Sequence, residues 1–263
     1  MRKIICGLVA LAVMSVSPPA FAGALLVPAY FSPSGTPNPW TTMCDGLGGA
    51  GPTSVAILNP DSGPGKTVDP NYTSALARCH LDGQRVIGYV ATRYSRQPIA
   101  TVEQQVATYY SFYPGLDGIF FDNMSSVPGK KASCKKCTMT VASYYAAIYD
   151  YVHANWSSAT VVANPGTPAT SDWQLSTPAA DAVVTFEGSA KSYVKYVPPS
   201  WVLAEPADRI ANIVYAAPVS TFAVDCSTAS ADNAGLFYVT DRTLKPDPYA
   251  ALPSYWSAET AAC

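Results

Sequence analysis

The chain contains 263 residues with 16 basic and 18 acidic side chains, a formal net charge of −2. Arg2 and Lys3 precede an apolar run and an A-x-A sequence ending at Ala22, which predicts a secretory signal peptide over residues 1–22. The 14 basic and 18 acidic residues that remain after this leader argue against nucleic acid or an anionic membrane as the main partner, without excluding a cationic substrate. No later stretch reaches about 18 uncharged apolar residues, so we expect no membrane insertion and a secreted or extracytoplasmic location.

The remaining part of the chain, residues 23–263, has the length of one α/β domain. Short apolar or β-branched segments bounded by Gly, Pro and polar residues predict eight strands, over 24–31, 53–58, 85–91, 116–123, 161–163, 182–186, 210–216 and 236–239. Helical spacing predicts helices over 69–81, 99–113, 140–156 and 250–261. Strands that alternate with helical or irregular connections predict a single-domain (β/α)8 barrel of the TIM type.

An open, doubly wound sheet is the alternative fold. Such a sheet normally carries a glycine-rich phosphate-binding turn after its first strand. The G-x-G-x-x-G match at residues 46–51 directly precedes the second predicted strand instead of following the first, and no G-x-x-x-x-G-K-[ST] occurs, so the barrel is favoured and no cofactor is expected.

The strand over 116–123 ends in a carboxylate, Asp122, followed by a polar loop. In a parallel barrel the C-terminal strand ends form the face that carries the chemistry, so an acid at this position is a catalytic candidate. Alternation along the strand predicts that Asp122 shares a face with Phe120 and that Asn123 lies on the opposite face. The structural alternative is that Asp122 only caps the following loop.

Elimination leaves carboxylates as the candidate catalytic groups. The two histidines, His80 and His153, fall in predicted helices, no G-x-S-x-G sequence is present, and no His, Cys and carboxylate cluster has metal-ligand spacing. Glu187 is the glutamate that follows a predicted strand, and we expect no metal. A helix cap or a salt bridge at the rim is the structural alternative for Glu187.

Asp122 and Glu187 are 65 residues apart, the length of two β/α units, which places them at the ends of the fourth and sixth strands. Strands two places apart lie roughly 9–10 Å from each other, so the two side chains can converge. Glycosidases need such a pair, since one carboxyl protonates the leaving oxygen while the other attacks or stabilises the anomeric centre. The spacing therefore predicts glycoside hydrolysis by a two-carboxylate mechanism.

Aromatic and amide side chains are also predicted at the same rim. Aromatic rings can stack on sugars, and amides and acids can bond their hydroxyl groups, so we predict a saccharide groove. The candidate substrate-binding residues are Tyr30, Asn59, Asp61, Tyr94, Asn123, Asn164, Tyr215 and Tyr238. For each Tyr the alternative is core or surface packing, and the Asn59 loop could equally be a rigid turn.

Six cysteines follow the leader, an even number that suggests disulfides in an exported protein. Six cysteines allow 15 connectivities. Proximity along the chain favours Cys44 with Cys79, Cys134 with Cys137, and Cys226 with Cys263. A zinc or thioredoxin-like role for the C-x-x-C pair is the alternative, although no second metal pair accompanies it.

Several segments resemble the spherulin-4-like family of secreted glycoside hydrolases. They span nearly the whole region after the leader: 27–31, 59–65, 86–90, 116–123, 164–166, 186–187 and 251–256. The resemblance implies a (β/α)8 barrel that hydrolyses, in an endo-acting manner, exopolysaccharides containing α-1,4-linked galactosamine or N-acetylgalactosamine, as in galactosaminogalactan-type biofilm polymers. It also implies that the family's two acids correspond to Asp122 and Glu187.

One position departs from the family pattern. Similar members usually carry Asp-Glu where this chain has Asp122-Asn123, and Asn can neither ionise nor donate an acidic proton. This favours a second hypothesis, a saccharide-binding cell-surface protein on a weakened or inactive barrel. A third candidate is hydrolysis of another amino-sugar polymer such as chitosan. In each case we expect a monomer whose partner is a polysaccharide.

Overall fold

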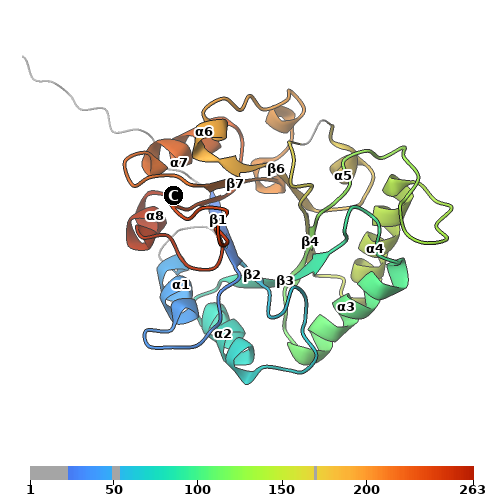
Figure 1. Cartoon of the computed structure of the whole chain (residues 1–263), viewed down its shortest axis with the longest axis horizontal. Helices are drawn as coiled ribbons and strands as arrows, with labels where there is room; N and C mark the ends of the chain where they lie inside the picture. Colours follow the sequence, from blue (N-terminus) through green and yellow to red (C-terminus); the bar gives the residue numbers. More distant parts are fainter. Residues whose placement is uncertain (1–22, 49–53, 169–170) are drawn as a thin grey trace, which may run out of the picture.

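A computed structural model describes residues 23–48, 54–168 and 171–263, and the predicted signal peptide lies outside these ranges. Eight parallel strands form a closed barrel in sequence order, with the helices around the outside (Figure 1). The strands are β1 (Ala24–Ala29), β2 (Val55–Leu58), β3 (Arg85–Ala91), β4 (Gly118–Asp122), β5 (Thr160–Ala163), β6 (Ala182–Ser189), β7 (Ile210–Tyr215) and β8 (Leu236–Val239). The predicted (β/α)8 barrel is thereby confirmed.

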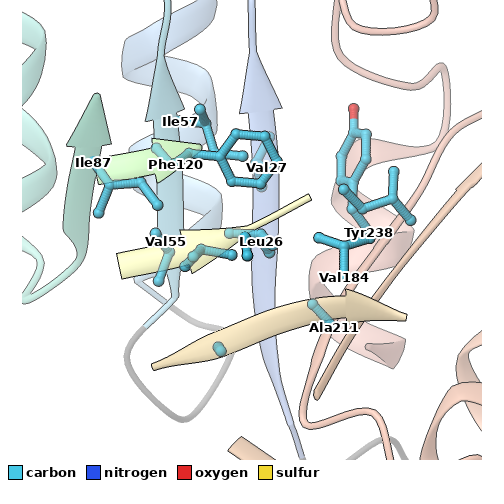
Figure 2. Close-up of a cluster of buried hydrophobic side chains, with 14 of the residues drawn as sticks. Leu26, Val27, Val55, Ile57, Ile87, Phe120, Val184, Ala211 and Tyr238 are labelled. Atoms are coloured by element: carbon cyan, nitrogen blue, oxygen red, sulfur yellow. The ribbon is translucent and has the colours of Figure 1, made fainter. Parts of the chain in front are cut away.

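Closure of the barrel rests on the pairing of β1 with both β2 and β8. Leu26 aligns with Val55 on one side, and Ala24 aligns with Leu236 on the other. An open, doubly wound sheet would leave the first or last strand at an edge, so that alternative is excluded. Apolar side chains from different strands meet in a buried cluster (Figure 2), among them Leu26, Val55, Ile87, Phe120, Val184 and Ala211.

The helices that surround the barrel are α1 (Pro39–Leu47), α2 (Pro70–Leu81), α3 (Ile99–Phe112), α4 (Val141–Asn155), α5 (Trp173–Ser176), α6 (Ala190–Tyr193), α7 (Phe222–Ala231) and α8 (Trp256–Ala262). Two 3-10 turns, Val202–Ala204 and Ala207–Arg209, precede β7. Short side chains cap several helix starts: Asn38 accepts from the amide of Trp40 at 2.9 Å, and Asp69 accepts from Asn71 at 2.9 Å. These bonds satisfy amides that have no partner within the helix.

The expected helices differ from the observed ones at several places. The helix predicted over 250–261 begins only at Trp256, because Pro253 lacks an amide hydrogen and favours a turn before it. Helix α1 was missed, although Asn38-Pro39 is the same cap and proline signal that marks the start of α2. Helix α7 was also missed, because its small and polar residues form no clear apolar stripe.

The three predicted disulfide pairings are present. Cys44 in α1 joins Cys79 in α2, with Cα atoms 4.8 Å apart, and the local pair Cys134–Cys137 has a Cα separation of 5.4 Å. A third bond ties Cys226 in α7 to Cys263 after α8, at 5.6 Å. The described part of the chain contains no helix with the length and apolar character needed to cross a membrane.

Candidate active site

Asp122 is the last residue of β4 and accepts hydrogen bonds from side chains of three elements. The Tyr89 hydroxyl in β3 donates to Asp122 Oδ2 at 2.7 Å, and the Asn123 amide donates to the same oxygen at 3.1 Å. Asn164, directly after β5, donates to Asp122 Oδ1 at 2.9 Å. Thr92 fixes the backbone, since its amide donates to the Asp122 carbonyl at 2.9 Å. The carboxylate is therefore held at the C-terminal mouth of the barrel.

Glu187 reaches the same mouth because β6 contains an irregularity. Val184 aligns with Ala211 and Glu187 aligns with Ile213, with a register shift between Val184 and Phe186. Aligned residues on parallel strands share a face, and Ala211 and Ile213 lie two apart on one strand. Val184 and Glu187 consequently share a face although they are three residues apart. Without the extra residue, simple alternation from Val184 would direct Glu187 to the other face of the sheet.

One amide group connects the two acids. The Nδ2 atom of Asn164 donates to Asp122 Oδ1 at 2.9 Å and to Glu187 Oε2 at 2.8 Å. Its Oδ1 atom accepts from the amide of Gly166 at 2.9 Å, which fixes the orientation of the side-chain amide. The predicted pair of acids thus converges at one end of the barrel, and Asn164 contacts both members rather than standing alone as a candidate sugar contact.

Three tyrosines form an aromatic wall beside this pair. Tyr249, in the segment between β8 and α8, donates from its hydroxyl to Glu187 Oε1 at 2.6 Å. Tyr30, just after β1, lies edge-on between Tyr89 and Tyr249, with ring centroids 5.4 Å and 5.5 Å away. The Tyr30 hydroxyl forms no hydrogen bond within the described residues, so it remains able to contact a ligand in the mouth.

The electrostatics of the site follow from its burial. Burial raises the pKa of Asp122 above its usual value and the nearby Glu187 carboxylate adds to the rise, while the donors from Tyr89, Asn123 and Asn164 oppose it. Burial, together with the negative charge of Asp122, also raises the pKa of Tyr30 and of Tyr89. The phenols therefore remain protonated and serve as neutral donors near neutral pH.

Asn123 does not lie on the face that alternation predicts. Its backbone φ of 51° is left-handed, so the chain leaves the extended conformation directly after Asp122. This turn brings the Asn123 amide back to Asp122 Oδ2. The expectation of an opposite face was wrong because β4 ends one residue earlier than assumed.

The other predicted substrate-binding residues separate into two groups. Tyr94 is exposed in the loop after β3, and Tyr215 ends β7, where it contributes to the raised pKa of Tyr249. Asn59 instead accepts from the amide of Gly63 at 2.9 Å and stabilises its own loop, where Asp61 is exposed. The rigid-turn alternative therefore describes Asn59.

Tyr238 is a correction to the predicted groove. Its side chain is fully buried among the core residues (Figure 2), so it has no surface to offer a ligand. The prediction placed it at the rim because it lies one residue from the end of β8, but the segment after the strand packs against it, with the Tyr249 ring centroid 6.4 Å from that of Tyr238.

Sequence reasoning missed Tyr89 and Tyr249. Tyr89 aligns with Phe120 across β3 and β4, so alternation applied to both strands would have placed it on the face of Asp122. Tyr249 carries no comparable signal, since it lies outside regular structure. A backbone bond of 3.2 Å from the Tyr30 amide to the Tyr249 carbonyl brings it to the mouth.

Metal binding finds no support in the described ranges, where no group of three or more His, Cys, Asp or Glu side chains could hold an ion. The chemistry available at the mouth is that of two hydrogen-bonded carboxyl groups and several phenols. Such a set can transfer protons and can attack or stabilise an electron-poor carbon.

Comparison with known proteins places this barrel in a family. The model of spherulation-specific family 4 matches residues 24–263. The chain belongs to spherulation-specific family 4. The family predicted from the sequence is thus confirmed. Spherulin-4 of Physarum polycephalum is 29% identical over 248 residues, covering 90% of this chain and 69% of that protein.

Solved structures show the same fold as this family member. Aspergillus clavatus Sph3, solved in complex with GalNAc, superimposes with a TM-score of 0.72 at 22% identity, covering 92% of this chain and 97% of that one. An endo-1,4-beta-mannanase from Rhizomucor miehei has a TM-score of 0.53 at 10% identity, with 94% of each chain covered. At these identities the similarity establishes the barrel and leaves the activity to the site.

Proposed function

We propose that this protein is an endo-acting glycoside hydrolase that cleaves exopolysaccharide containing α-1,4-linked galactosamine or N-acetylgalactosamine, of the galactosaminogalactan type found in biofilms. The observation that carries the proposal is the contact of one Asn164 nitrogen with both Asp122 and Glu187. Two carboxyl groups at this separation, open to a barrel mouth with exposed and half-buried aromatic rings, match the needs of glycosidic bond cleavage. The fold shared with Sph3, solved in complex with GalNAc, supports an amino-sugar substrate.

The separation of the acids favours retention of anomeric configuration. Asp122 Oδ1 and Glu187 Oε2 lie 2.9 Å and 2.8 Å from the same nitrogen, so they cannot be more than the sum of these distances, 5.7 Å, apart. Retaining enzymes place their carboxyl groups about 5–5.5 Å apart, whereas inverting enzymes need about 6.5–9.5 Å to admit a water molecule. We predict that NMR of freshly released product shows the α-anomer before mutarotation; initial β-anomer would contradict this prediction.

We assign Asp122 as the nucleophile and Glu187 as the acid and base. Burial raises the pKa of Asp122, which by itself suits an acid, but three side-chain donors bind this group. All three occupy acceptor lone pairs and therefore stabilise the ionised form that a nucleophile requires. Glu187 accepts from two side chains, Asn164 and Tyr249.

The proposed reaction proceeds in two steps. Glu187 protonates the glycosidic oxygen while Asp122 attacks the anomeric carbon, which breaks the glycosidic bond and forms an ester between the sugar and Asp122. Ionised Glu187 then removes a proton from a water molecule that attacks the same carbon, releasing Asp122 and returning the proton to Glu187. Two displacements at one carbon restore the original configuration.

The test is a product assay with purified protein on defined amino-sugar polymers. We expect oligosaccharides and new reducing ends from an α-1,4-linked galactosamine polymer of defined degree of N-acetylation. We expect little release from chitosan with the same length and degree of acetylation. Mass spectrometry of the products distinguishes internal cleavage from removal of terminal residues. Cleavage of chitosan in preference to the galactosamine polymers would overturn the proposed substrate.

A saccharide-binding protein without hydrolytic activity is the second candidate, favoured by Asn123. This side chain bonds Asp122 but can neither ionise nor donate an acidic proton. That candidate predicts measurable polymer binding with no reducing ends after prolonged incubation, and a gain of activity in Asn123→Glu.

We further propose that residues 1–22 are removed as a signal peptide and that the barrel acts as a monomer outside the cytoplasm. The three disulfides support this location, because such bonds persist in oxidising compartments.

A further inference from the structure

A separate pocket of about 530 Å³ opens at Asn123, the residue that follows Asp122. It is lined by Arg93, Tyr94, Arg96, Gln97, Pro98 and Asn123. Asn123 connects this pocket to the site, since its amide donates to Asp122 Oδ2 at 3.1 Å. Neither Asp122 nor Glu187 lines the pocket, so it adjoins the position of bond cleavage without containing it.

The wall of the pocket is an unusual backbone turn. Arg93, Tyr94 and Ser95 have φ values of 51°, 56° and 61°, which places three successive residues other than glycine in the left-handed region. Such residues enter this region at an energetic cost and usually singly. A strained conformation that the surrounding contacts maintain is often found where a ligand binds.

Contacts with the loop that follows Asp122 hold this turn in place. The Tyr94 amide donates to the Asn123 carbonyl at 2.6 Å, and the Ser133 amide donates to the buried hydroxyl of Ser95 at 3.1 Å. The turn and the candidate nucleophile are thus fixed relative to each other. A group bound in the pocket would have a defined position relative to the scissile bond.

The charges in the pocket are all positive. Arg93 and Arg96 are exposed, neither forms an ion pair with any described residue, and no carboxylate belongs to the lining. By contrast, in a cavity at the opposite end of the barrel, Arg209 pairs with Glu205 at 2.8 Å and Arg85 bonds the Thr160 hydroxyl. The guanidinium groups of this pocket are therefore available to an external anion.

Tyr94 adds a surface suited to a sugar ring. Its side chain is 46% exposed at the edge of the same pocket. An exposed aromatic ring can stack on the apolar face of a pyranose, while a planar guanidinium group matches the geometry of a carboxylate. The lining thus combines ring recognition with anion recognition.

We propose that this pocket is a subsite for a sugar residue that carries a carboxylate, such as a hexuronic acid, next to the cleaved linkage. This inference rests on the proposed glycosidase function and goes beyond the proposed substrate, because it requires a polymer in which an acidic sugar neighbours the cleaved amino-sugar linkage. The two arginines attract the carboxylate, and the same charges disfavour a residue with a free ammonium group at this position.

Binding can be measured apart from hydrolysis in a Glu187→Gln background, because Glu187 does not line the pocket. The probes are an α-1,4-linked oligogalacturonate and an α-1,4-linked N-acetylgalactosamine oligomer of equal length, compared by calorimetry at two salt concentrations. Arg93→Gln/Arg96→Gln is the test variant. Lys191→Gln/Lys195→Gln removes the same charge from exposed positions in and after α6 and is the control.

We expect the preference for the oligogalacturonate over the neutral oligomer to fall at least about tenfold in the arginine variant, together with its salt dependence, and to stay unchanged in the lysine variant. An unchanged preference in the arginine variant, or an equal loss in the lysine variant, would overturn the subsite. Equal weakening of both oligomers would show a pocket that accepts any sugar and would also overturn it. Failure of the wild-type protein to release reducing ends, with the arginine-dependent preference intact, would refute the hydrolase and leave the subsite standing.

Discussion

Asn164 determines how far apart the two candidate catalytic acids lie. Both hydrogens of one amide nitrogen are directed to carboxylate oxygens, on Asp122 in β4 and Glu187 in β6. Since the Oδ1 atom of Asn164 accepts from the Gly166 amide, the side-chain amide cannot rotate to favour one acid without losing a bond. Asn164 is therefore a positioning residue between two acids that share no other described donor.

Asn164→Ala should lower kcat by about 10²-fold and move the acid limb of the pH profile of kcat/KM to higher pH. The shift follows because the Asn164 bond opposes the burial that raises the pKa of Asp122. In the mechanism that we propose, Asp122 must be ionised to react. Asn155→Ala, at the exposed end of α4, is the matched control for a lost amide. A fall in kcat without movement of the acid limb would assign Asn164 a structural role only.

At the level of single residues, the sequence indicates the two acids and fails to identify their hydrogen-bond partners. Asp122 ends β4 and Glu187 lies within β6, and the apolar run before each acid is visible in the pattern of residue types. Tyr249 becomes a partner of Glu187 only through the path of the segment after β8, which no local pattern encodes. Asn123 was assigned to the wrong face because a left-handed residue reverses the chain after β4.

Strands β4 and β6 direct their acids by different means. β4 is regular, and Asp122 follows from alternation along Gly118, Phe120 and Asp122. β6 needs a register shift between Val184 and Phe186 to bring Glu187 to the same side. The shift depends on pairing with β7, so the sequence of β6 alone could not predict it. The strand positions could be predicted because an apolar run is a local feature of the sequence. The register shift could not, because it depends on pairing between strands that are distant in the sequence.

Gly118 allows β4 to approach β5 closely. A Cβ atom at this position would collide with the backbone of Thr160, whereas one at Gly129 would meet nothing within 4 Å. We expect Gly118→Ala to lower the free energy of unfolding by about 3 kcal/mol or more and to reduce activity by displacing Asp122. Chemical denaturation of both variants tests this expectation. Equal stability of Gly118→Ala and Gly129→Ala would show that the two strands can separate at little cost.

A buried carboxyl group in α8 joins the last helix to the last strand of the barrel. Glu259 is fully buried and accepts from the Val239 amide in β8 at 3.1 Å, so it attaches the last helix to the last strand. Burial raises the pKa of Glu259 well above its usual value. The folded protein therefore retains a proton that the unfolded chain releases above about pH 4.3.

The free energy of unfolding of the wild type therefore falls as the pH rises from the pKa of Glu259 in the unfolded chain to its pKa in the folded protein. Glu259→Gln keeps an acceptor for the Val239 amide and does not titrate. The free energy of unfolding of this variant, relative to that of the wild type, should therefore increase by up to about 1.4 kcal/mol per pH unit above about pH 4.3. Urea denaturation of both proteins between pH 4 and pH 8 tests the sign, because the other carboxyl groups contribute equally to both. Parallel stability curves would show that Glu259 ionises in the folded state.

The barrel as a whole was predictable because its signal repeats along the chain. Eight apolar segments at β/α spacing support one another, and two of the three cysteine pairs tie neighbouring helices together. The helices after β5 and β6 are short, with four residues each in α5 and α6, so their positions could be inferred only from the count of strands. Family membership follows from the whole chain, whereas the choice of polymer depends on a few side chains at the mouth.

The most direct test of the central claim is the initial rate of reducing-end release from N-acetylgalactosamine polymer by wild-type protein, Asp122→Asn and Glu187→Gln, each with a folded state confirmed by circular dichroism. We predict measurable release by the wild type and a loss of at least about 10³-fold in each variant, since each removes one carboxyl from a pair that acts together. Activity within about tenfold of the wild type in either folded variant would contradict cleavage by these two acids.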